Sequence, residues 1–366
     1  MQVKTIHIIA AARPNFMKVA PLYHALKNER WCSTVLIHTG QHYDVNMSDS
    51  FFSDLCLPAP DIHLGVGSDT HAKQTAGVMV AYEKICIEKQ PDFVVVVGDV
   101  NSTMACTLVA KKMNLHVGHL EAGLRSGDRT MPEEINRIVT DSLSDVLWTP
   151  SLDADNNLIR EGIPAERIVR VGNIMIDSYE MLKERIDAED MPVKMELDRK
   201  SYGVVTLHRP SNVDTKSRLK TLVSALVDIS KYLPLVFPVH PRTQKMLKDF
   251  KLWEEIEKAV AIYLLEPLGY IHFMSLVKDA KLLMTDSGGI QEETSYLNTP
   301  CLTLRETTER PITITQGTNR LVSPIELETC VQEILSGEWP QALCPEYWDG
   351  FTAGRVAKSM YGYLTK

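Results

Sequence analysis

Short runs of β-branched and aliphatic residues alternate with longer stretches of helical periodicity almost from one end of the chain to the other. This alternation is typical of parallel sheets covered by helices. The run FVVVV at 93–97 is apolar on both faces, as a central parallel strand must be. We expect strands at 3–11, 34–38, 93–97, 115–119 and 167–171 in the first half, and at 203–207, 235–239, 261–264, 281–284 and 301–304 in the second.

The pattern predicts two α/β units. The chain has 366 residues, which at about 150 residues per domain is enough for two. We place an N-terminal Rossmann-like domain at 1–172 and a second at 173–349. The stretch 182–200 is charged and weakly periodic, and it is the best linker candidate. The segment 350–366 has helical spacing, and we expect it to pack back on the first domain.

Charge and composition narrow the class of partner. Asp and Glu number 47 against 39 Lys and Arg, a formal charge of −8, which argues against a broad nucleic-acid or anionic membrane surface. No apolar stretch approaches the ~20 residues that span a bilayer, and the N-terminus resembles a first strand more than a signal peptide. The seven cysteines are scattered without a CxxC pair. These features predict a protein of the reducing cytoplasm.

Unusual polar residues gather in loops that follow strands, where open parallel sheets bind ligands. After the first strand, Arg13 and Lys18 flank a helix start that Pro14 favours. Two cations beside free helix N–H groups form an anion site, unless this is an ordinary capped helix with solvated charges. No GxGxxG sequence precedes a helix here, so a nicotinamide site is not supported.

A second phosphate-binding candidate follows the strand at 281–284. Ser287, Gly288 and Gly289 would let backbone N–H groups approach a phosphate closely, and a carboxylate one turn later could accept from ribose hydroxyls. A glycine-rich turn with a serine cap would explain the glycines but not the paired glutamates.

The densest cluster is acidic. Asp99 follows one buried strand, Glu121 follows the next, and Glu133 opens the following helix. Neighbouring parallel strands lie ~4.8 Å apart, so these acids can converge, repel one another and raise at least one pKa. That creates the distinct acid and base which proton transfer at carbon requires. Singly, each has a structural reading: Asp99 as a cap, Glu121 as a partner of Arg125, and Glu133 as favourable charge at a helix start.

Histidines end two strands of the second half. His208 leads into a polar loop where a general acid or a leaving-group contact could sit, and His240 repeats the arrangement at the next strand. The segment 305–311 adds cations for phosphate. Metal sites are weakly supported, because His116 and His119 fall on opposite faces of a strand and His38 with His42 lacks a third ligand.

Taken in order, these motifs resemble the non-hydrolysing UDP-N-acetylglucosamine 2-epimerase family. They are Arg13-Pro14 with Lys18, the Gly98-Asp99 turn, HLEAGLRSGD at 119–128, PEEINR at 132–137, His208-Arg209, DSGGIQEE at 286–293 and TTERP at 307–311. The resemblance implies a fold similar to GT-B glycosyltransferases, with two Rossmann-like domains facing across a cleft. It also implies a homodimer that acts on a UDP-amino sugar without a nicotinamide cofactor, and together with the residues above we expect no cofactor and no metal.

The resemblance further implies roles for single residues. Catalytic roles fall on Asp99, Glu121, Glu133 and His208, while Arg137 matches a site residue whose role stays open. The positions that match UDP-binding residues are Arg13, Lys18, His240, Ser287, Gly288, Gly289, Glu293 and Arg310, with Glu293 on the ribose. The implied reaction is reversible C2 epimerisation of UDP-N-acetylglucosamine to UDP-N-acetylmannosamine, by elimination of UDP to 2-acetamidoglucal and readdition.

The sequence also departs from the family pattern. Asn15-Phe16 follows Arg13-Pro14 where a glutamate and a small residue are usual, and Pro210-Ser211 follows His208-Arg209 where Arg-Glu is common. Gln41-His42 matches the second nucleotide-sugar site of bacterial members, but residues 43–45 match it poorly. Alternative functions are therefore a hydrolysing 2-epimerase, an epimerase of a modified UDP-amino sugar, a GT-B glycosyltransferase and a non-catalytic nucleotide-sugar sensor.

Overall fold

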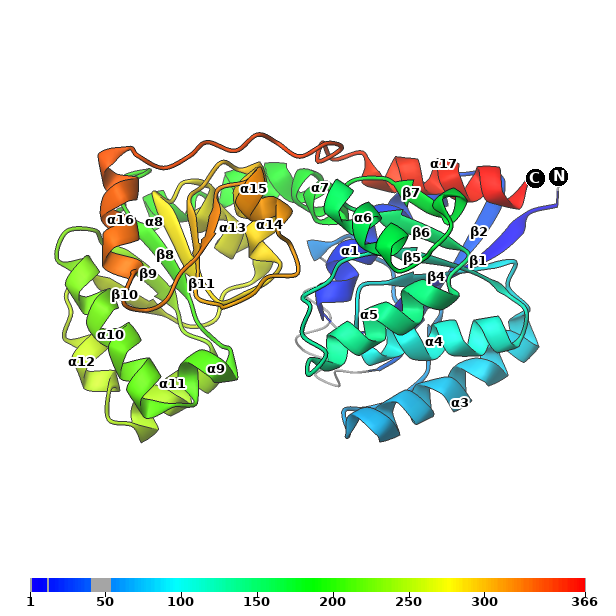
Figure 1. The fold of residues 1–366 in the computed structure, drawn as a ribbon, viewed down its shortest axis with the longest axis horizontal. Helices are drawn as coiled ribbons and strands as arrows, with labels where there is room; N and C mark the ends of the chain where they lie inside the picture. Colours follow the sequence, from blue (N-terminus) through cyan, green and yellow to red (C-terminus); the bar gives the residue numbers. More distant parts are fainter. Residues whose placement is uncertain (1, 12, 41–53, 366) are drawn as a thin grey trace. The chain divides into compact units, whose positions relative to one another are not determined.

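The computed structural model describes residues 2–11, 13–40 and 54–365. They group into two compact units, which we call unit 1 (1–181 with 346–366) and unit 2 (182–345). Each unit is an α/β sandwich around one parallel sheet, drawn in Figure 1. The α/β fold with two parallel sheets predicted from the sequence is confirmed. The domain limits expected there, 1–172 and 173–349, stay a prediction.

The sheet of unit 1 has seven described strands in the order β3-β2-β1-β4-β5-β6-β7, all parallel. The chain runs outward from β1 to β3 and then crosses back to β4, so the strand order reverses between β1 and β4. The carboxyl ends of these two strands mark the switch point at which such sheets bind ligands. The strands are β1 (Lys4–Ala10), β2 (Cys32–His38), β3 (Ile62–His63), β4 (Phe93–Val97), β5 (His116–Leu120), β6 (Val146–Thr149) and β7 (Ile168–Arg170).

Helices cover both faces of this sheet (Figure 1). On one face α3 (His71–Lys89), α4 (Asn101–Lys112) and α5 (Pro132–Leu143) lie side by side, and on the other α1 (Arg13–Lys27) packs against α17 (Thr352–Leu364). The remaining helices of this part of the chain are α6 (Leu152–Arg160), the short 3-10 helix Ala165–Arg167 and α7 (Ile174–Glu189), which runs on past residue 181.

The C-terminal helix α17 is fastened to unit 1 by specific polar contacts. The buried carboxylate of Asp177 accepts hydrogen bonds from the backbone amides of Thr352 and Ala353 at 3.1 and 2.7 Å, which satisfies donors that have no partner within the helix. The indole of Trp148 in β6 donates to the Ser359 hydroxyl at 2.9 Å. The last residues of the chain therefore complete the fold of its first part.

Unit 2 has a six-stranded parallel sheet in the order β10-β9-β8-β11-β12-β13, which reverses between β8 and β11. Its strands are β8 (Gly203–Thr206), β9 (Leu235–Pro238), β10 (Ile262–Leu265), β11 (Leu282–Thr285), β12 (Cys301–Thr303) and β13 (Asn319–Leu321). Its helices are α8 (Met191–Lys194), α9 (Pro210–Val213), α10 (Lys216–Ser230), α11 (Pro241–Asp249), α12 (Trp253–Glu257), α13 (Tyr270–Lys278), α14 (Ile290–Tyr296), α15 (Ile312–Thr315) and α16 (Leu327–Ser336).

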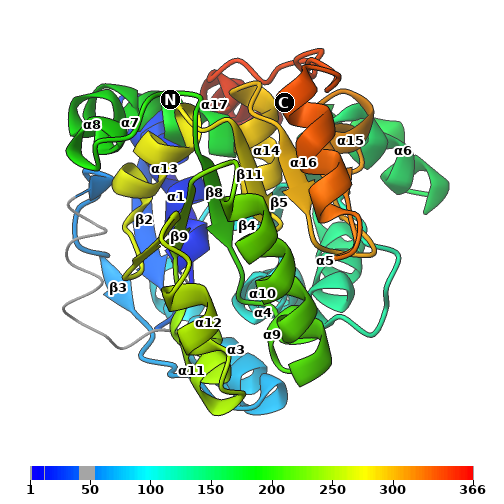
Figure 2. The same ribbon diagram turned by 90° about the vertical axis from the view of Figure 1, so that its left-hand side faces the viewer.

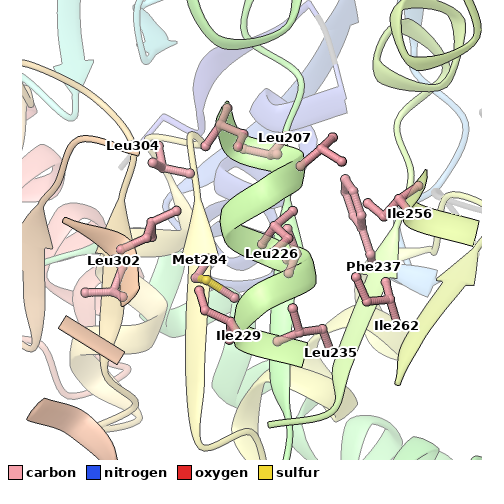
Figure 3. Close-up of a cluster of buried hydrophobic side chains, with 14 of the residues drawn as sticks. Leu207, Leu226, Ile229, Leu235, Phe237, Ile256, Ile262, Met284, Leu302 and Leu304 are labelled. Carbon is pink, nitrogen blue, oxygen red and sulfur yellow. The ribbon is translucent and has the colours of Figure 1, made fainter. Parts of the chain in front are cut away.

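One apolar cluster holds this sheet to α10. Buried residues recur along α10 at helical spacing, so that Leu226 and Ile229 face the sheet. Figure 3 shows them between Phe237 of β9 and Met284 of β11. Figures 1 and 2 show α16 beside α10 on the same face. A rigid sheet of this kind fixes the positions of the loops that leave its strands.

All ten predicted strands are present, with ends within two residues of those expected. The described residues contain three further strands, β3, β6 and β13, which the sequence analysis did not predict. The stretch 182–200, expected to be a linker, is largely helical, because α7 continues to Glu189 and α8 follows. No described helix is both long and apolar enough to cross a membrane.

Candidate active site

The switch point of unit 1 holds a buried ion pair. Lys18, in the second turn of α1, pairs with Glu121, the residue after β5. The side chains are 12% and 3% exposed, respectively. Glu121 has φ +71°, in the left-handed region that costs a non-glycine residue about 1–2 kcal/mol. Such strain gathers at functional sites, and the strained residue here is the one whose carboxylate pairs with Lys18.

Gly98, at the end of β4, leaves the space that this ion pair occupies. Its φ is +67°, and a Cβ there would lie 3.2 Å from the Lys18 ammonium and 3.3 Å from a Glu121 carboxylate oxygen. The same Cβ would lie 3.4 Å from the amide of Asn15. Asn15 is buried and donates to the Val97 carbonyl at 2.9 Å, so one departure from the family pattern packs against β4.

A second acid of this site is held by an arginine. Asp99 follows Gly98, and its carboxylate lies 2.5 Å from the Arg137 guanidinium. Arg137 is held in turn by the buried Glu134 at 2.6 Å. Burial would raise the pKa of Glu134, but hydrogen bonds from the Ser126 and Gly127 amides and the charge of Arg137 outweigh it and hold this pKa below its usual range. Asp99 is 34% exposed on its side chain, so it is the accessible member of this set.

A buried network lies behind these acids. The ring nitrogens of His119 are 2.6 Å from an Asp141 carboxylate oxygen and 2.8 Å from the Gly98 carbonyl oxygen. Asp141 also pairs with Arg125 at 2.7 Å. The reading of Glu121 as the partner of Arg125 is therefore wrong, because Asp141 takes that place. The network ties the end of β4 to α5.

The remaining candidates of unit 1 stand apart from these pairs. Glu133 lies in the first turn of α5, partly exposed, and within the described residues its carboxylate has no ion-pair partner. Arg13 begins α1, but its side chain lies outside the described residues, as do Gln41 and His42.

Two of the acids of unit 1 are therefore paired with cations. Lys18 pairs with Glu121, and Arg137 pairs with Asp99. Of the three carboxylates expected to converge and repel one another, Glu121 and Asp99 are each neutralised by a cation, whereas Glu133 has no ion-pair partner among the described residues. In the described part of the chain, no group of three or more His, Cys, Asp or Glu side chains is placed to hold a metal ion.

In unit 2, His208 is joined to a fully buried carboxylate. His208 follows β8, Asp286 follows β11, and the His208 Nδ1 lies 2.8 Å from an Asp286 oxygen. Burial would raise the pKa of Asp286, but the His208 ring and the amides of Arg209 and His208 outweigh it and hold this pKa below its usual range. Asp286 lies in the DSGGIQEE motif, but nothing in its local sequence indicates a role of its own.

His240 lies beside His208, with 5.6 Å between ring centroids. It is the N-cap of α11, where its Nδ1 accepts from the Arg242 amide at 3.2 Å. Burial lowers the pKa of His240, and the nearby charges of His208 and Arg242 lower it further, against the opposing effect of Asp286. The two histidines predicted as site residues in unit 2 are therefore neighbours.

The two glycines after β11 differ in the space around them. A Cβ on Gly288 would lie 2.5 Å from a Glu309 oxygen, whereas a Cβ on Gly289 would meet nothing within 4 Å. Gly289 also has an ordinary helical φ of −61°. Neither packing nor backbone conformation among the described residues requires glycine at 289.

Glu293 is buried one turn into α14, and the Tyr270 hydroxyl donates to it at 2.5 Å. Burial raises its pKa to about 7, with a further rise from Glu292, against the opposing effects of Tyr270 and Arg310. A carboxylate that titrates near neutrality can respond to a ligand that donates hydrogen bonds. Tyr270 was not anticipated, because nothing in its local sequence marks it.

The cations predicted to bind phosphate belong to a buried network. Glu309 accepts from Arg305 at 2.9 Å and from Arg310 at 2.6 Å, and Arg310 also pairs with Glu292 at 3.0 Å. Despite burial, the two arginines hold the pKa of Glu309 far below its usual range. The Nη1 of Arg305 is buried without a hydrogen-bond partner among the described residues. Both guanidinium groups border the Gly288 backbone.

Comparisons with known proteins agree on one family. The family model described as UDP-N-acetylglucosamine 2-epimerase matches residues 24–361. A UDP-N-acetylglucosamine 2-epimerase from Methanocaldococcus jannaschii is 44% identical over 327 residues, covering 87% of this chain and 88% of that protein. A UDP-2,3-diacetamido-2,3-dideoxy-D-glucuronate 2-epimerase from Pseudomonas aeruginosa is 38% identical over 317 residues, covering 86% of this chain and 87% of that protein.

Solved structures agree with this result. The crystal structure of M. jannaschii UDP-GlcNAc 2-epimerase in complex with UDP-GlcNAc and UDP is similar with a TM-score of 0.86 at 39% identity, covering 98% of this chain and 99% of that one. A lipopolysaccharide outer core galactosyltransferase, 12% identical, is similar with a TM-score of 0.60 over 99% of this chain and all of that one. At that identity the likeness concerns the fold alone, and it confirms the expected similarity to glycosyltransferases.

Proposed function

This chain belongs to the UDP-N-acetylglucosamine 2-epimerase family, and we propose that it interconverts UDP-N-acetylglucosamine and UDP-N-acetylmannosamine by inverting C2. The observation that carries the proposal is the pair of separately held acids at the switch point of unit 1. Glu121 is held by Lys18 and Asp99 by Arg137.

The reaction needs two stages, because the C2 hydrogen of an N-acetyl sugar is not acidic. Departure of UDP breaks the C1–O bond, with the electron pair going to the diphosphate oxygen, and leaves oxocarbenium character at C1. The C2 proton then becomes removable by a carboxylate, which yields enzyme-bound 2-acetamidoglucal and UDP. Readdition of UDP to C1, with protonation of C2 from the opposite face, gives the epimer. General acid–base groups typically contribute 10²–10⁴-fold to such steps.

Unit 1 supplies groups suited to the proton transfers. Asp99, Glu121 and Glu133 are the carboxylates, and the first two are fixed by cations. Positioned ion pairs keep a carboxylate aimed at a reacting atom, which matters because a misplacement of about 1 Å can cost about 10²-fold in rate. Arg137 acts in this scheme by holding Asp99.

Unit 2 supplies groups suited to the diphosphate and ribose. Ser287, Gly288 and Gly289 offer backbone N–H groups, and a glycine at 289 that no packing requires is consistent with close approach of a ligand. Arg310 is a cation for the diphosphate, and Glu293 accepts from the ribose hydroxyls. His208 and His240 contact the leaving group. Arg13 and Lys18 keep the UDP-binding roles implied by the resemblance.

Proton NMR in deuterated water tests this proposal. With UDP-N-acetylglucosamine as substrate, we expect UDP-N-acetylmannosamine to form and deuterium to enter C2 of both nucleotide sugars. Epimer formed without deuterium at C2 would contradict the elimination route. Accumulation of free N-acetylmannosamine and UDP would instead identify a hydrolysing enzyme, and UDP binding without any turnover would identify a sensor.

A modified UDP-amino sugar is the second candidate substrate. The 38% identity to the P. aeruginosa diacetamido-glucuronate epimerase favours it, because that protein performs a 2-epimerisation on a more heavily substituted sugar. The discriminating measurement is kcat/KM for UDP-N-acetylglucosamine and UDP-2,3-diacetamido-2,3-dideoxy-glucuronate, assayed side by side. We expect the former to be preferred.

Assembly and location are part of the same proposal. We expect a homodimer, as the resemblance implies, and light scattering on the full chain should give twice the mass of one chain. We also expect a cytoplasmic protein. The seven cysteines all lie in the described part of the chain and none is joined in a disulfide there, which is consistent with that compartment.

A further inference from the structure

We propose that Asp286 is a positioning residue, which fixes His208 as the Nδ1–H tautomer and leaves its Nε2 to serve the departing diphosphate. The inference rests on the proposed function and adds a residue to it. The two residues are 78 positions apart, so the local sequence of one does not suggest the other. They meet because β8 and β11 are neighbours at the switch point of unit 2.

The Asp286 carboxylate is itself held rigidly. Its residue is 0% exposed, and its oxygens accept from the backbone amides of His208 at 3.0 Å and Arg209 at 2.9 Å, and from the Asn212 side chain at 3.2 Å. Asn212 also donates to the Leu304 carbonyl at 2.9 Å, which anchors it to the end of β12. These donors belong to the segment that carries His208 and the short helix that follows it. The Asp286 carboxylate and this segment therefore hold each other in place.

The tautomer follows from the chemistry of the contact. A carboxylate whose pKa is below its usual range is ionised at neutral pH and can only accept. Because it lies 2.8 Å from His208 Nδ1, that nitrogen must carry the hydrogen. Neutral His208 therefore presents an Nε2 lone pair, and protonated His208 presents an Nε2–H. With its side chain 40% exposed, the ring remains accessible to a ligand.

The charged groups near the His208 ring come from α11, from its own loop and from Asp286. His240 of α11 lies 5.6 Å away between centroids, and Arg242 of the same helix and Arg209 of the same loop are cationic. Arg242 is partly neutralised by Asp214 at 2.5 Å. Asp286 is thus the anion in direct contact with the imidazole, and its hydrogen bond with Nδ1 orients the ring that serves the diphosphate as the C1–O bond breaks.

Nitrogen-15 NMR of histidine-labelled full-length protein tests the tautomer directly. The His208 signals are identified by their loss in His208→Asn. We expect a pyrrole-type Nδ1 and a pyridine-type Nε2 in neutral wild-type His208. The opposite pattern would overturn the proposal. This measurement needs no variant at Asp286, so it holds even where that variant fails to fold.

Asp286→Asn tests the consequence. Three donors surround one carboxylate oxygen, so the amide oxygen should take that place and turn its NH₂ toward His208 Nδ1, reversing the tautomer. We expect kcat to fall by about 10²–10⁴-fold, as loss of a positioned acid predicts, while the Kd for UDP changes less than about threefold. Asp228→Asn, which removes an exposed carboxylate paired with Lys231 in the same unit, is the matched control and should keep full activity.

The outcomes separate this inference from the proposed function. If wild-type protein shows C2 exchange but Asp286→Asn keeps wild-type kcat, the positioning role is wrong and the epimerase proposal stands. The same holds if His208→Asn keeps wild-type kcat. If wild-type protein shows no turnover of any UDP-amino sugar, the proposed function itself is wrong, whatever the tautomer.

Discussion

Both units contain buried pairs of acids and cations, but the candidate functional member of the pair differs between them. In unit 1 the candidate catalytic groups are acids, and the cations Lys18 and Arg137 hold them. In unit 2 the candidate phosphate-binding group Arg310 is a cation, and the acids Glu309 and Glu292 hold it. A buried charge needs a partner in either case, because an unpaired ion in a protein interior is very costly.

This contrast indicates which member of a buried ion pair is the functional candidate. The member that is strained, accessible or next to a glycine which makes room for it is the better functional candidate. In unit 1 these marks fall on Glu121, with its left-handed backbone, and on the partly exposed Asp99. In unit 2 the glycine does not single out one member, because a Cβ on Gly288 would lie 2.5 Å from Glu309 and 3.3 and 3.4 Å from Arg310 and Arg305.

The largest effect should come from removing a cation that holds an acid. Lys18→Met breaks a buried ion pair with Glu121, which we expect to cost up to about 3–5 kcal/mol of stability and to abolish most turnover. Thermal denaturation and a UDP-sugar turnover assay measure the two effects. Lys4→Met breaks the half-exposed pair with Asp92 and should cost less than about 1 kcal/mol. Equal losses in both variants would contradict the assignment.

The next effect concerns the space beside the ion pair. Gly98→Ala puts a Cβ against Lys18 and Glu121 at a φ of +67°, and we expect about 10²-fold lower kcat. Gly162→Ala carries a similar φ of +83° but meets nothing within 4 Å. Both variants should lose about 1–2 kcal/mol of stability from backbone strain. Only Gly98→Ala should lose activity, and loss in both would mean that strain alone matters.

A smaller effect separates the two glycines of unit 2. Gly289→Ala meets open space, so we expect unchanged stability and roughly tenfold weaker UDP binding by calorimetry. Gly288→Ala drives a Cβ into Glu309 and should lose about 1–3 kcal/mol of stability. Wild-type UDP affinity in Gly289→Ala would remove the argument for a phosphate beside this turn.

The smallest effect is the pH dependence of UDP binding. Since burial raises the pKa of Glu293 to about 7 and the ribose contact needs the carboxylate, a proton competes with the nucleotide below that pH. The Kd for UDP should therefore fall about tenfold as pH rises from about 6 to 8. In Glu293→Gln only the titration of the nucleotide phosphate should remain. An identical pH profile in both proteins would exclude this role.

Periodicity and burial made the ten main strands predictable, whereas the missed strands carry weak signals. β6 is the four-residue run VLWT, β3 has two residues, and β13 contains Asn319 and Arg320. Such short strands form because neighbouring strands pair with them, which is a tertiary effect that local pattern does not contain.

The loops of the candidate site were predictable, because active-site loops follow strands, but their pairings were not. The structural alternative for Glu121 was a pairing with Arg125, which is close in sequence. The partner is instead Lys18, 103 positions away. Asp286 and Glu309 were overlooked for the same reason, because a carboxylate's role depends on the partners that the sheet order brings to it.

The most direct test of the account is solvent exchange at C2 in Glu121→Gln. We predict that the folded variant binds UDP within about threefold of wild type and loses at least 10²-fold in the rate at which deuterium enters C2 of UDP-N-acetylglucosamine. Glu161→Gln, which removes the surface partner of Arg125, should exchange at the wild-type rate. Exchange at the wild-type rate in Glu121→Gln would contradict the claim that the acids of unit 1 carry the proton chemistry.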